Sequence, residues 1–200
     1  MKKTFYFLSF ILLFNACTPS KILVENDIYR QEKRTFLIQE KKAYKESNKW
    51  LSHWYPVKLT WIKIDKKPDS LKLKMELKVN HNQRISDDFY LKTDEYIFRI
   101  EPVNIIKETL NEYNDTLTET TTNEGDDEKE EKEKETTTIT HSVSNKIVDS
   151  YIIELILDRE IIQHLQKAKK IKIHFYLNDF GYNIDFNAYD RNRLKKFFEK

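Results

Sequence analysis

The sequence predicts an α+β fold: an antiparallel β-sheet domain with flanking helices and a C-terminal unit in the order helix, β-hairpin, helix. Apolar and polar residues alternate over long stretches of the middle of the chain, which is the pattern of strands with one face in water. Apolar residues recur with a helical period on both sides of these stretches. A β-sandwich with appended helices is the alternative, because several short alternating strands would also build one.

Residues 29–55 are predicted to form an amphipathic helix. Apolar residues recur there at spacings of seven, and neither Gly nor Pro interrupts the stretch. A strand that begins at residues 35–38 is the alternative. The two apolar series are Tyr29, Phe36, Ala43 and Trp50, and Leu37, Tyr44 and Leu51.

The period changes to two after Pro56, which predicts half-buried strands over residues 57–61 and 71–79. Pro68 and Asp69 supply the turn between these two strands. Further strands are expected near residues 89–91 and 95–101.

Residues 105–122 and 136–157 flank an acidic run, 126–135, that holds seven acidic residues and three lysines. The tetrapeptide ETTT occurs on both sides of this run. Threonine-rich arms around a charged tip predict two long strands paired as a hairpin, with a disordered acidic loop at about residues 120–138. A plain linker between two domains is the alternative.

The last part of the chain predicts two helices around a hairpin. Asp158 is expected to cap the first helix and Asp190 the second. Residues 171–177 and 182–188 alternate as the two strands of the hairpin, around a turn at residues 178–181. The apolar positions of the two helices are Ile161, Ile162, Leu165 and Ala168, and Leu194, Phe197 and Phe198. The apolar face of the second helix is expected to pack on the sheet.

The first sixteen residues have the layout of a signal peptide. Two lysines follow Met1, an eleven-residue uncharged stretch covers residues 4–14, and the small residue Ala16 comes before Cys17. The apolar stretch is shorter than the roughly 20 residues that a membrane-spanning helix needs. Residues 1–16 are therefore expected to be removed.

Phe14, Asn15, Ala16 and Cys17 resemble the lipobox of bacterial lipoproteins, in which a small residue precedes an invariant cysteine. Phe14 stands where Leu is usual, and Asn15 stands where Ser, Ala or Thr is usual. The resemblance implies acylation of Cys17 and a lipid anchor in the bacterial envelope. Thr18 after the cysteine favours the outer membrane, with the domain facing the periplasm. Plain secretion is the alternative.

Residues 17–27 are then expected to be a lipidated polar tether, and residues 28–200 a single α+β domain. The formal charge of +2 falls to about zero once Lys2 and Lys3 leave with the signal peptide. Lysines are spread along the chain, whereas nucleic-acid binding needs a clustered basic face. No nucleic-acid partner is expected.

Catalytic and metal-binding motifs are absent from the sequence. It contains no G-x-S-x-G, P-loop or S-x-x-K motif. The five histidines lack the short spacings of a metal site, so neither a metal nor a cofactor is expected. They are His53, His81, His141, His164 and His174. Turns and helix caps are the expected roles of two groups of acidic residues: Asp87, Asp88, Asp94 and Glu95, and Asp179, Asp185 and Asp190.

The three tryptophans, Trp50, Trp54 and Trp61, lie close together in the sequence. One interpretation is an aromatic surface that stacks on a sugar or a peptide. The other is a core where a helix meets the sheet, which the i, i+4 spacing of Trp50 and Trp54 favours.

These observations predict a membrane-anchored envelope lipoprotein that acts as a non-enzymatic binding or assembly module. Its partners would be the membrane, through lipid on Cys17, and an envelope protein or polysaccharide. The rival hypothesis is an envelope hydrolase that acts on a cell-wall or surface polymer. A concave pocket with two or more carboxylates would favour the hydrolase, and an exposed tryptophan on a sheet face would favour the binding module.

Overall fold

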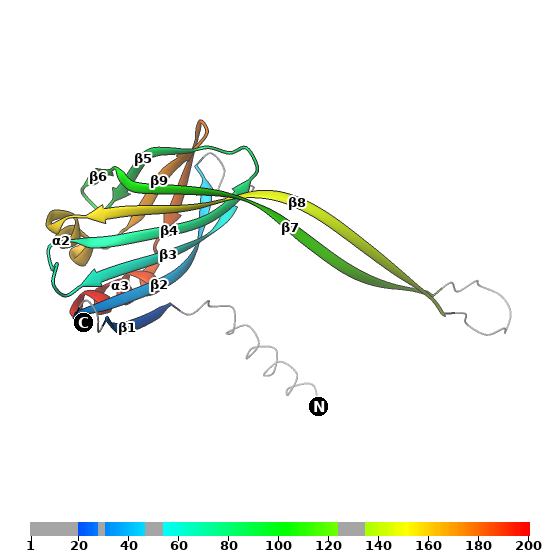
Figure 1. The fold of residues 1–200 in the computed structure, drawn as a ribbon, viewed down its shortest axis with the longest axis horizontal. Coiled ribbons are helices and arrows are strands. Elements are labelled where there is room, and N and C mark those ends of the chain that lie inside the picture. Colours follow the sequence, from blue (N-terminus) through cyan, green and yellow to red (C-terminus); the bar gives the residue numbers. More distant parts are fainter. Residues whose placement is uncertain (1–19, 28–30, 47–53, 124–134) are drawn as a thin grey trace, which may run out of the picture.

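The computed structural model describes residues 20–27, 31–46, 54–123 and 135–200, and its ten strands form one antiparallel sheet. The strand order is β6-β5-β9-β10-β2-β3-β4-β8-β7, and β1 pairs with β2 beside this path (Figure 1). The elements are β1 (Lys21–Asp27), β2 (Glu32–Lys45), β3 (Trp54–Ile64), β4 (Leu71–Asn80), β5 (Ile85–Lys92), β6 (Ile97–Ile100), β7 (Pro102–Asn123), β8 (Glu135–Leu157), α2 (Arg159–Lys167), β9 (Lys172–Leu177), β10 (Phe180–Asp185) and α3 (Ala188–Glu199).

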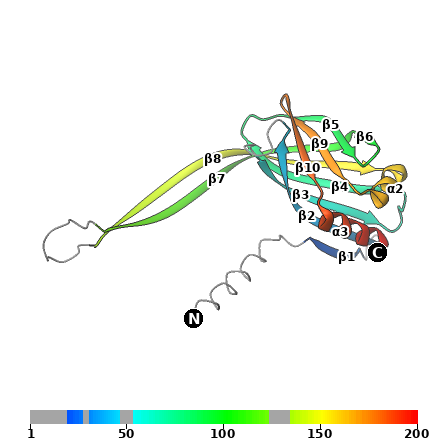
Figure 2. The same cartoon turned by 180° about the vertical axis from the view of Figure 1, so that it is seen from behind.

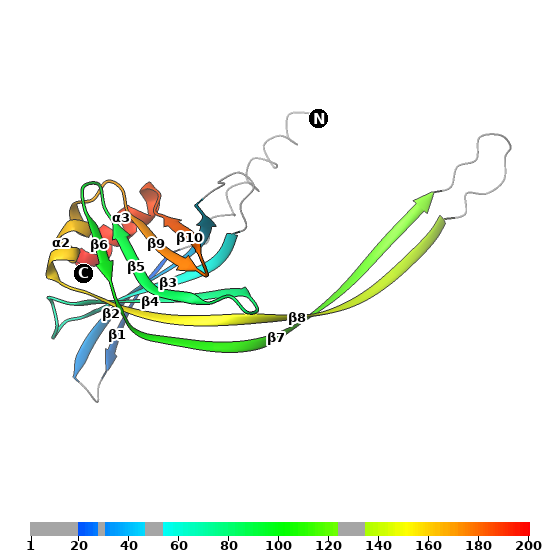
Figure 3. The same cartoon turned by 90° about the horizontal axis from the view of Figure 1, so that it is seen from above.

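The sheet curls until β5 and β6 approach β7 and β8 (Figure 3), and its inner side encloses the hydrophobic core. Helices α2 and α3 lie at one end of the curled sheet, as Figure 2 shows from behind. Alternate residues of the strands point inward, which is why the period-two pattern marked them. The largest fully buried side chains include Trp61, Phe89, Phe175, Phe197, Leu59 and Met75.

The antiparallel sheet with helices that the sequence predicted is confirmed in this coarse form. Residues 57–61 lie in β3 and residues 71–79 in β4, and these strands pair with Leu59 opposite Met75. The described strands belong to one continuous sheet and not to two facing sheets. The β-sandwich alternative is therefore wrong.

The helix predicted over residues 29–55 is wrong, because residues 32–45 form strand β2. This strand lies between β3 on one edge and both β1 and β10 on the other. Leu37, Gln39 and Ala43 are buried on its inner face, while Phe36 and Ile38 are half-buried on the opposite face. Because both faces of β2 carry apolar residues, its sequence does not alternate between apolar and polar residues. Its apolar residues also recur at spacings of seven, which is the pattern expected of a helix.

The polar tether predicted for residues 17–27 is also wrong over most of its length. Residues 21–27 form strand β1, which pairs with β2 from Lys21 opposite Ile38 to Asp27 opposite Glu32. Ile22 packs against the core, and Ser20 is buried. The sheet therefore begins within a few residues of Cys17, although Cys17 itself lies outside the described residues.

The predicted long hairpin is confirmed, because β7 and β8 pair from Pro102 opposite Leu155 to Asn123 opposite Glu135. The linker alternative is wrong. The strands extend into the region predicted as a disordered loop, and the acidic residues 124–134 lie outside the described residues.

The C-terminal unit has the predicted order of elements. Asp158 caps α2 and accepts a hydrogen bond from the Ile161 amide, as expected. The cap of α3 is Asn187 and not Asp190. Asp190 lies at the third helical position and completes a capping box with the Asn187 amide. Asp190 was therefore predicted as the cap although it lies inside the first turn, because acidic residues are common at both positions.

Candidate functional site

A groove with a volume of about 860 Å³ crosses the outer face of the sheet. Its lining comes mainly from β2, β3 and β4, and it also includes Ser150 of β8, Asp185 of β10 and Asn187. Val57 and Leu77, whose backbones lie beneath it, point into the core. The side chains next to them along the strands therefore project into the groove. These include Lys58, Glu76 and Lys78.

Trp54 is the large aromatic residue at one end of the groove. Its side chain is 47% exposed, and it stands opposite Tyr44 in the pairing of β3 with β2. The ammonium nitrogen of Lys42 lies 4.0 Å from the centroid of the Trp54 ring. This cation–π contact orients the indole, and it leaves close to half of the side chain in contact with water.

Ammonium and carboxylate groups alternate along the groove. Glu76 forms ion pairs with Lys58 at 3.5 Å and with Lys74 at 3.2 Å. Lys78 pairs with Glu112 of β7 at 2.6 Å. These groups are partly exposed, so each pair contributes little to stability, on the order of 1 kcal/mol or less. They give the groove closely spaced hydrogen-bond donors and acceptors.

The structure separates the tryptophans that the sequence grouped together. Trp61 is buried on the inner face, where its indole nitrogen donates a hydrogen bond to Gln39 at 2.9 Å. Trp54 is exposed on the outer face. Trp50 lies outside the described residues. The predicted core role is therefore confirmed for Trp61 and wrong for Trp54, because the two side chains leave β3 on opposite faces.

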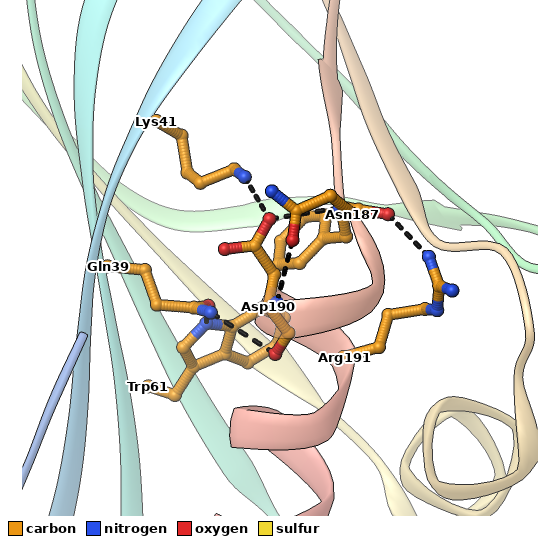
Figure 4. Close-up of polar contacts among 7 residues, drawn as sticks. Gln39, Lys41, Trp61, Asn187, Asp190 and Arg191 are labelled. Carbon is orange, nitrogen blue, oxygen red and sulfur yellow. Dashed lines mark hydrogen bonds and ion pairs between the residues drawn. The ribbon is translucent and has the colours of Figure 1, made fainter. Parts of the chain in front are cut away.

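A polar network inside the sheet holds α3 in place (Figure 4). The Gln39 amide nitrogen donates to the Asp190 carbonyl at 3.3 Å, and Lys41 forms an ion pair with the Asp190 carboxylate. The same carboxylate accepts a hydrogen bond from the Asn187 amide at 2.9 Å. Asp190 thus joins the start of α3 to β2, which is a structural role.

A second charge cluster lies where the long hairpin meets the rest of the sheet. The Asp149 side chain of β8 is fully buried and accepts four hydrogen bonds. The donors are His81 at 3.1 Å, the Asn82 amide at 2.9 Å, Thr109 at 3.0 Å and Lys107 at 3.0 Å. Asp149 therefore connects β7, β8 and the turn after β4.

Burial of the Asp149 carboxylate would raise its pKa, but hydrogen bonds from Lys107, His81, Thr109 and the Asn82 amide outweigh this effect. They lower the pKa of Asp149 to about 2. In return, the hydrogen bond to Asp149 raises the pKa of Lys107. The carboxylate is therefore charged and satisfied near neutral pH, as a structural anchor requires.

Asp149 was not predicted as a buried anchor, although its position in the sequence carries a signal. Asp149 has the same parity along β8 as Tyr151, Ile153 and Leu155, which all point inward. A carboxylate at an inward position must find partners, because an unpaired buried charge is costly. The identity of those partners was not visible, since His81 and Lys107 lie 68 and 42 residues away along the chain.

The long hairpin extends beyond the rest of the sheet. Pairing of β4 with β8 ends at Asn80 opposite Val148, while β7 and β8 continue to pair with each other. We call residues 111–123 and 135–147 the arm. Thirteen residues of β8, 135–147, span about 40 Å at 3.3 Å per residue. Figures 1 and 3 show the arm leaving the end of the sheet opposite α2 and α3.

Several of the other acidic residues and histidines singled out from the sequence have partners in the structure. Asp88 pairs with Arg99 at 2.8 Å, and Asp94 accepts a hydrogen bond from the Lys169 amide. His164 contacts Tyr96. Within the described residues, no three His, Cys, Asp or Glu side chains lie close enough together to hold a metal ion. His53 and the side chain of His141 lie outside what the structure describes.

Comparisons with known proteins identify no relative. No protein-family model matches the chain, and no curated protein or solved structure matches it either. Among the described residues, no helix combines the length and the apolar character needed to span a membrane.

Proposed function

We propose that this chain is a lipid-anchored envelope protein that acts without catalysis and docks onto another envelope protein through its arm. The arm is the observation that carries this proposal. Over residues 111–123 and 135–147, the two strands pair only with each other among the described residues. A two-stranded ribbon is at best marginally stable in water. A partner that covers the arm would supply the missing contacts.

The edges of the arm suit pairing with another chain. β7 is the last strand in the sheet order, so its outer backbone groups have no strand partner within the described residues. Such edges are templates for an added strand, and many proteins bind peptides in this way. Tyr113 is 72% exposed and Ile147 is exposed near the base of the arm, so two apolar side chains are available there.

The proposed anchor and the arm have different reaches. Cys17 lies four residues before Lys21, where β1 begins, and four residues span about 14 Å at most. Acylation of Cys17 would thus hold the sheet close to the membrane surface. The arm spans about 40 Å, so it could meet a partner that the sheet itself does not reach.

The hydrolase remains a second candidate because three carboxylates line the groove: Glu40, Glu76 and Asp185. A glycosidase needs one carboxyl group that keeps its proton. Glu76 is paired with Lys58 and Lys74, and Asp185 lies 3.5 Å from Lys172. Both carboxylates are thus already engaged with lysine ammonium groups, an arrangement that suits hydrogen bonding to a bound ligand better than proton donation to a leaving group.

The test is affinity purification from native membranes with a tagged full chain and a shortened arm. The shortened variant replaces residues 114–144 by Asn-Gly, which joins Tyr113 to Asn145 in their present pairing through a two-residue turn. We expect the full chain to retain a specific protein and the shortened chain to lose it. Trp54→Ala is the control and should retain the partner. Capture of the same protein by the shortened chain would refute docking through the arm.

The anchor is tested separately with Cys17→Ser. We expect this variant to lose labelling by radioactive fatty acid and to leave the membrane fraction or remain as an unprocessed precursor. The shortened-arm variant serves as the control, because it keeps Cys17 and should stay labelled. Acyl labelling of Cys17→Ser would show that the lipid lies elsewhere.

A further inference from the structure

We infer that the groove on the outer face of β2, β3 and β4 is a binding site for a neutral saccharide chain, with Trp54 as its stacking platform. The groove adjoins the base of the arm, where Lys78 pairs with Glu112, but the inference stands whether or not the arm binds a protein. It rests on the exposed indole, the balance of charges and the dimensions of the groove.

The exposed aromatic surface is the first argument. Trp54 leaves 47% of its side chain in water, although an indole gains more than most side chains from being covered. Tyr44 stands opposite it across the β2–β3 pair, and Lys42 holds the ring from one side. A flat apolar ring with polar groups around it suits a sugar, which has an apolar C–H face and hydroxyl groups at its rim.

The charge balance decides between a neutral ligand and an anionic one. Three lysines and three carboxylates line the groove, and a fourth lysine, Lys41, is ion-paired with Asp190. An anionic polymer or an anionic lipid surface would meet as many repulsive groups as attractive ones. Hydroxyl groups both donate and accept hydrogen bonds, so they can use ammonium and carboxylate groups alike. The six groups are Lys42, Lys58, Lys78, Glu40, Glu76 and Asp185.

The dimensions favour a chain over a single sugar. The groove crosses from β2 to β8, which are three strand spacings apart, or about 14 Å. Its volume of about 860 Å³ is within the range of small-molecule sites. A protein partner would need a larger apolar centre than one tryptophan provides. We therefore assign an oligosaccharide segment to this groove.

The test is isothermal titration calorimetry with the Cys17→Ser protein and three neutral hexasaccharides: cellohexaose, maltohexaose and chitohexaose. We expect at least one of them to bind and Trp54→Ala to weaken that binding about tenfold or more. Trp54→Phe should keep part of the affinity. Because the site is neutral, raising NaCl from 50 mM to about 500 mM should change the Kd little.

Tyr189→Ala is the matched control. Tyr189 is also 47% exposed and also contacts a cation, Arg193, but it lies on α3 outside the groove. It should leave saccharide binding unchanged, as should the shortened arm. The inference is overturned if none of the three hexasaccharides binds, or if Trp54→Ala binds as tightly as the parent protein. Binding only to dextran sulfate or to vesicles of anionic lipid would overturn it as well.

Discussion

The curled part of the sheet and the arm use the same antiparallel pairing but are held together by different forces. In the curled part, strands such as β4 and β9 have neighbours on both edges and bury an apolar face. In the arm, β7 and β8 pair only with each other within the described residues, and their sequences are rich in threonine. Backbone hydrogen bonds are common to both regions, whereas apolar burial stabilises mainly the first.

Asp149 marks the boundary between these two regions. On the C-terminal side of Asp149, alternate residues of β8 point into the core: Tyr151, Ile153 and Leu155. On its N-terminal side, pairing with β4 ends at Val148 and the arm begins. A buried carboxylate with four donors holds both strands at this point. These contacts connect the base of the arm to the turn after β4, whereas beyond this point β7 and β8 pair only with each other within the described residues.

The largest expected effect is the loss of a core aromatic residue. Trp61→Ala should lower the free energy of unfolding by about 3 to 5 kcal/mol, because it removes a fully buried ring beside Phe186 and breaks a hydrogen bond to Gln39. Tyr113→Ala, at the base of the arm, should change it by about 0.5 kcal/mol or less. Urea unfolding followed by circular dichroism measures both. Equal losses would show that the arm and the core are one energetic unit.

The next effect is expected at the junction. Asp149→Asn should leave the ammonium of Lys107 without its counter-charge and loosen the root of the arm. Hydrogen exchange should accelerate at the amides of Asn82 and Thr109, while amides in β9 and β10 keep their protection. If exchange accelerates equally across the whole sheet, Asp149 contributes to the stability of the entire fold and not only to the junction.

The same junction predicts an acid transition. The Asp149 pKa is about 2 in the folded protein and about 3.8 when unperturbed, so the unfolded chain binds the proton more readily. Its contribution is therefore complete above about pH 4 and is lost as the pH falls through 2. Exchange at the junction should rise over this window in the parent protein. The Asp149→Asn variant should lack this pH dependence of hydrogen exchange. If the pH dependence persists in the variant, another carboxyl group causes it.

The smallest of these effects concerns the cap of α3. Asn187→Ala should cost about 1 kcal/mol, because it removes the side chain that accepts a hydrogen bond from the Asp190 amide. Asn145→Ala is the control, since Asn145 is exposed on the arm. Thermal unfolding compares the two. If the arm variant were the less stable one, the assignment of stability to the curled sheet would be wrong.

Local patterns predicted the elements whose two faces differ. Strand β4 could be predicted because its apolar residues, Leu71, Leu73 and Met75, alternate with lysine and glutamate. The hairpin of β7 and β8 could be predicted because similar threonine-rich segments flank a charged tip. The same logic failed for β2, which carries apolar residues on both faces. It also failed for β1, whose apolar residues Ile22, Leu23 and Val24 are consecutive and do not alternate with polar ones.

The candidate site was harder to predict than the fold. Trp54 was noticed as one of three tryptophans, but its neighbours Lys42 and Lys78 come from other strands. Their meeting on one face depends on the β2–β3 and β3–β4 registers. A shift of one residue in either register would turn these side chains to the other face of the sheet.

Three features could be predicted without coordinates, because each depends on residues close together in the chain. They are the lipobox-like segment around Cys17, the alternation of β3, β4 and β8, and the helix that follows Asp158. Three other features became visible only in the folded chain: residues 21–27 join the sheet, Asp149 contacts His81 and Lys107, and Trp54 lines a groove. These contacts join distant segments, and the curl and strand order that bring them together are set by burial of the whole core.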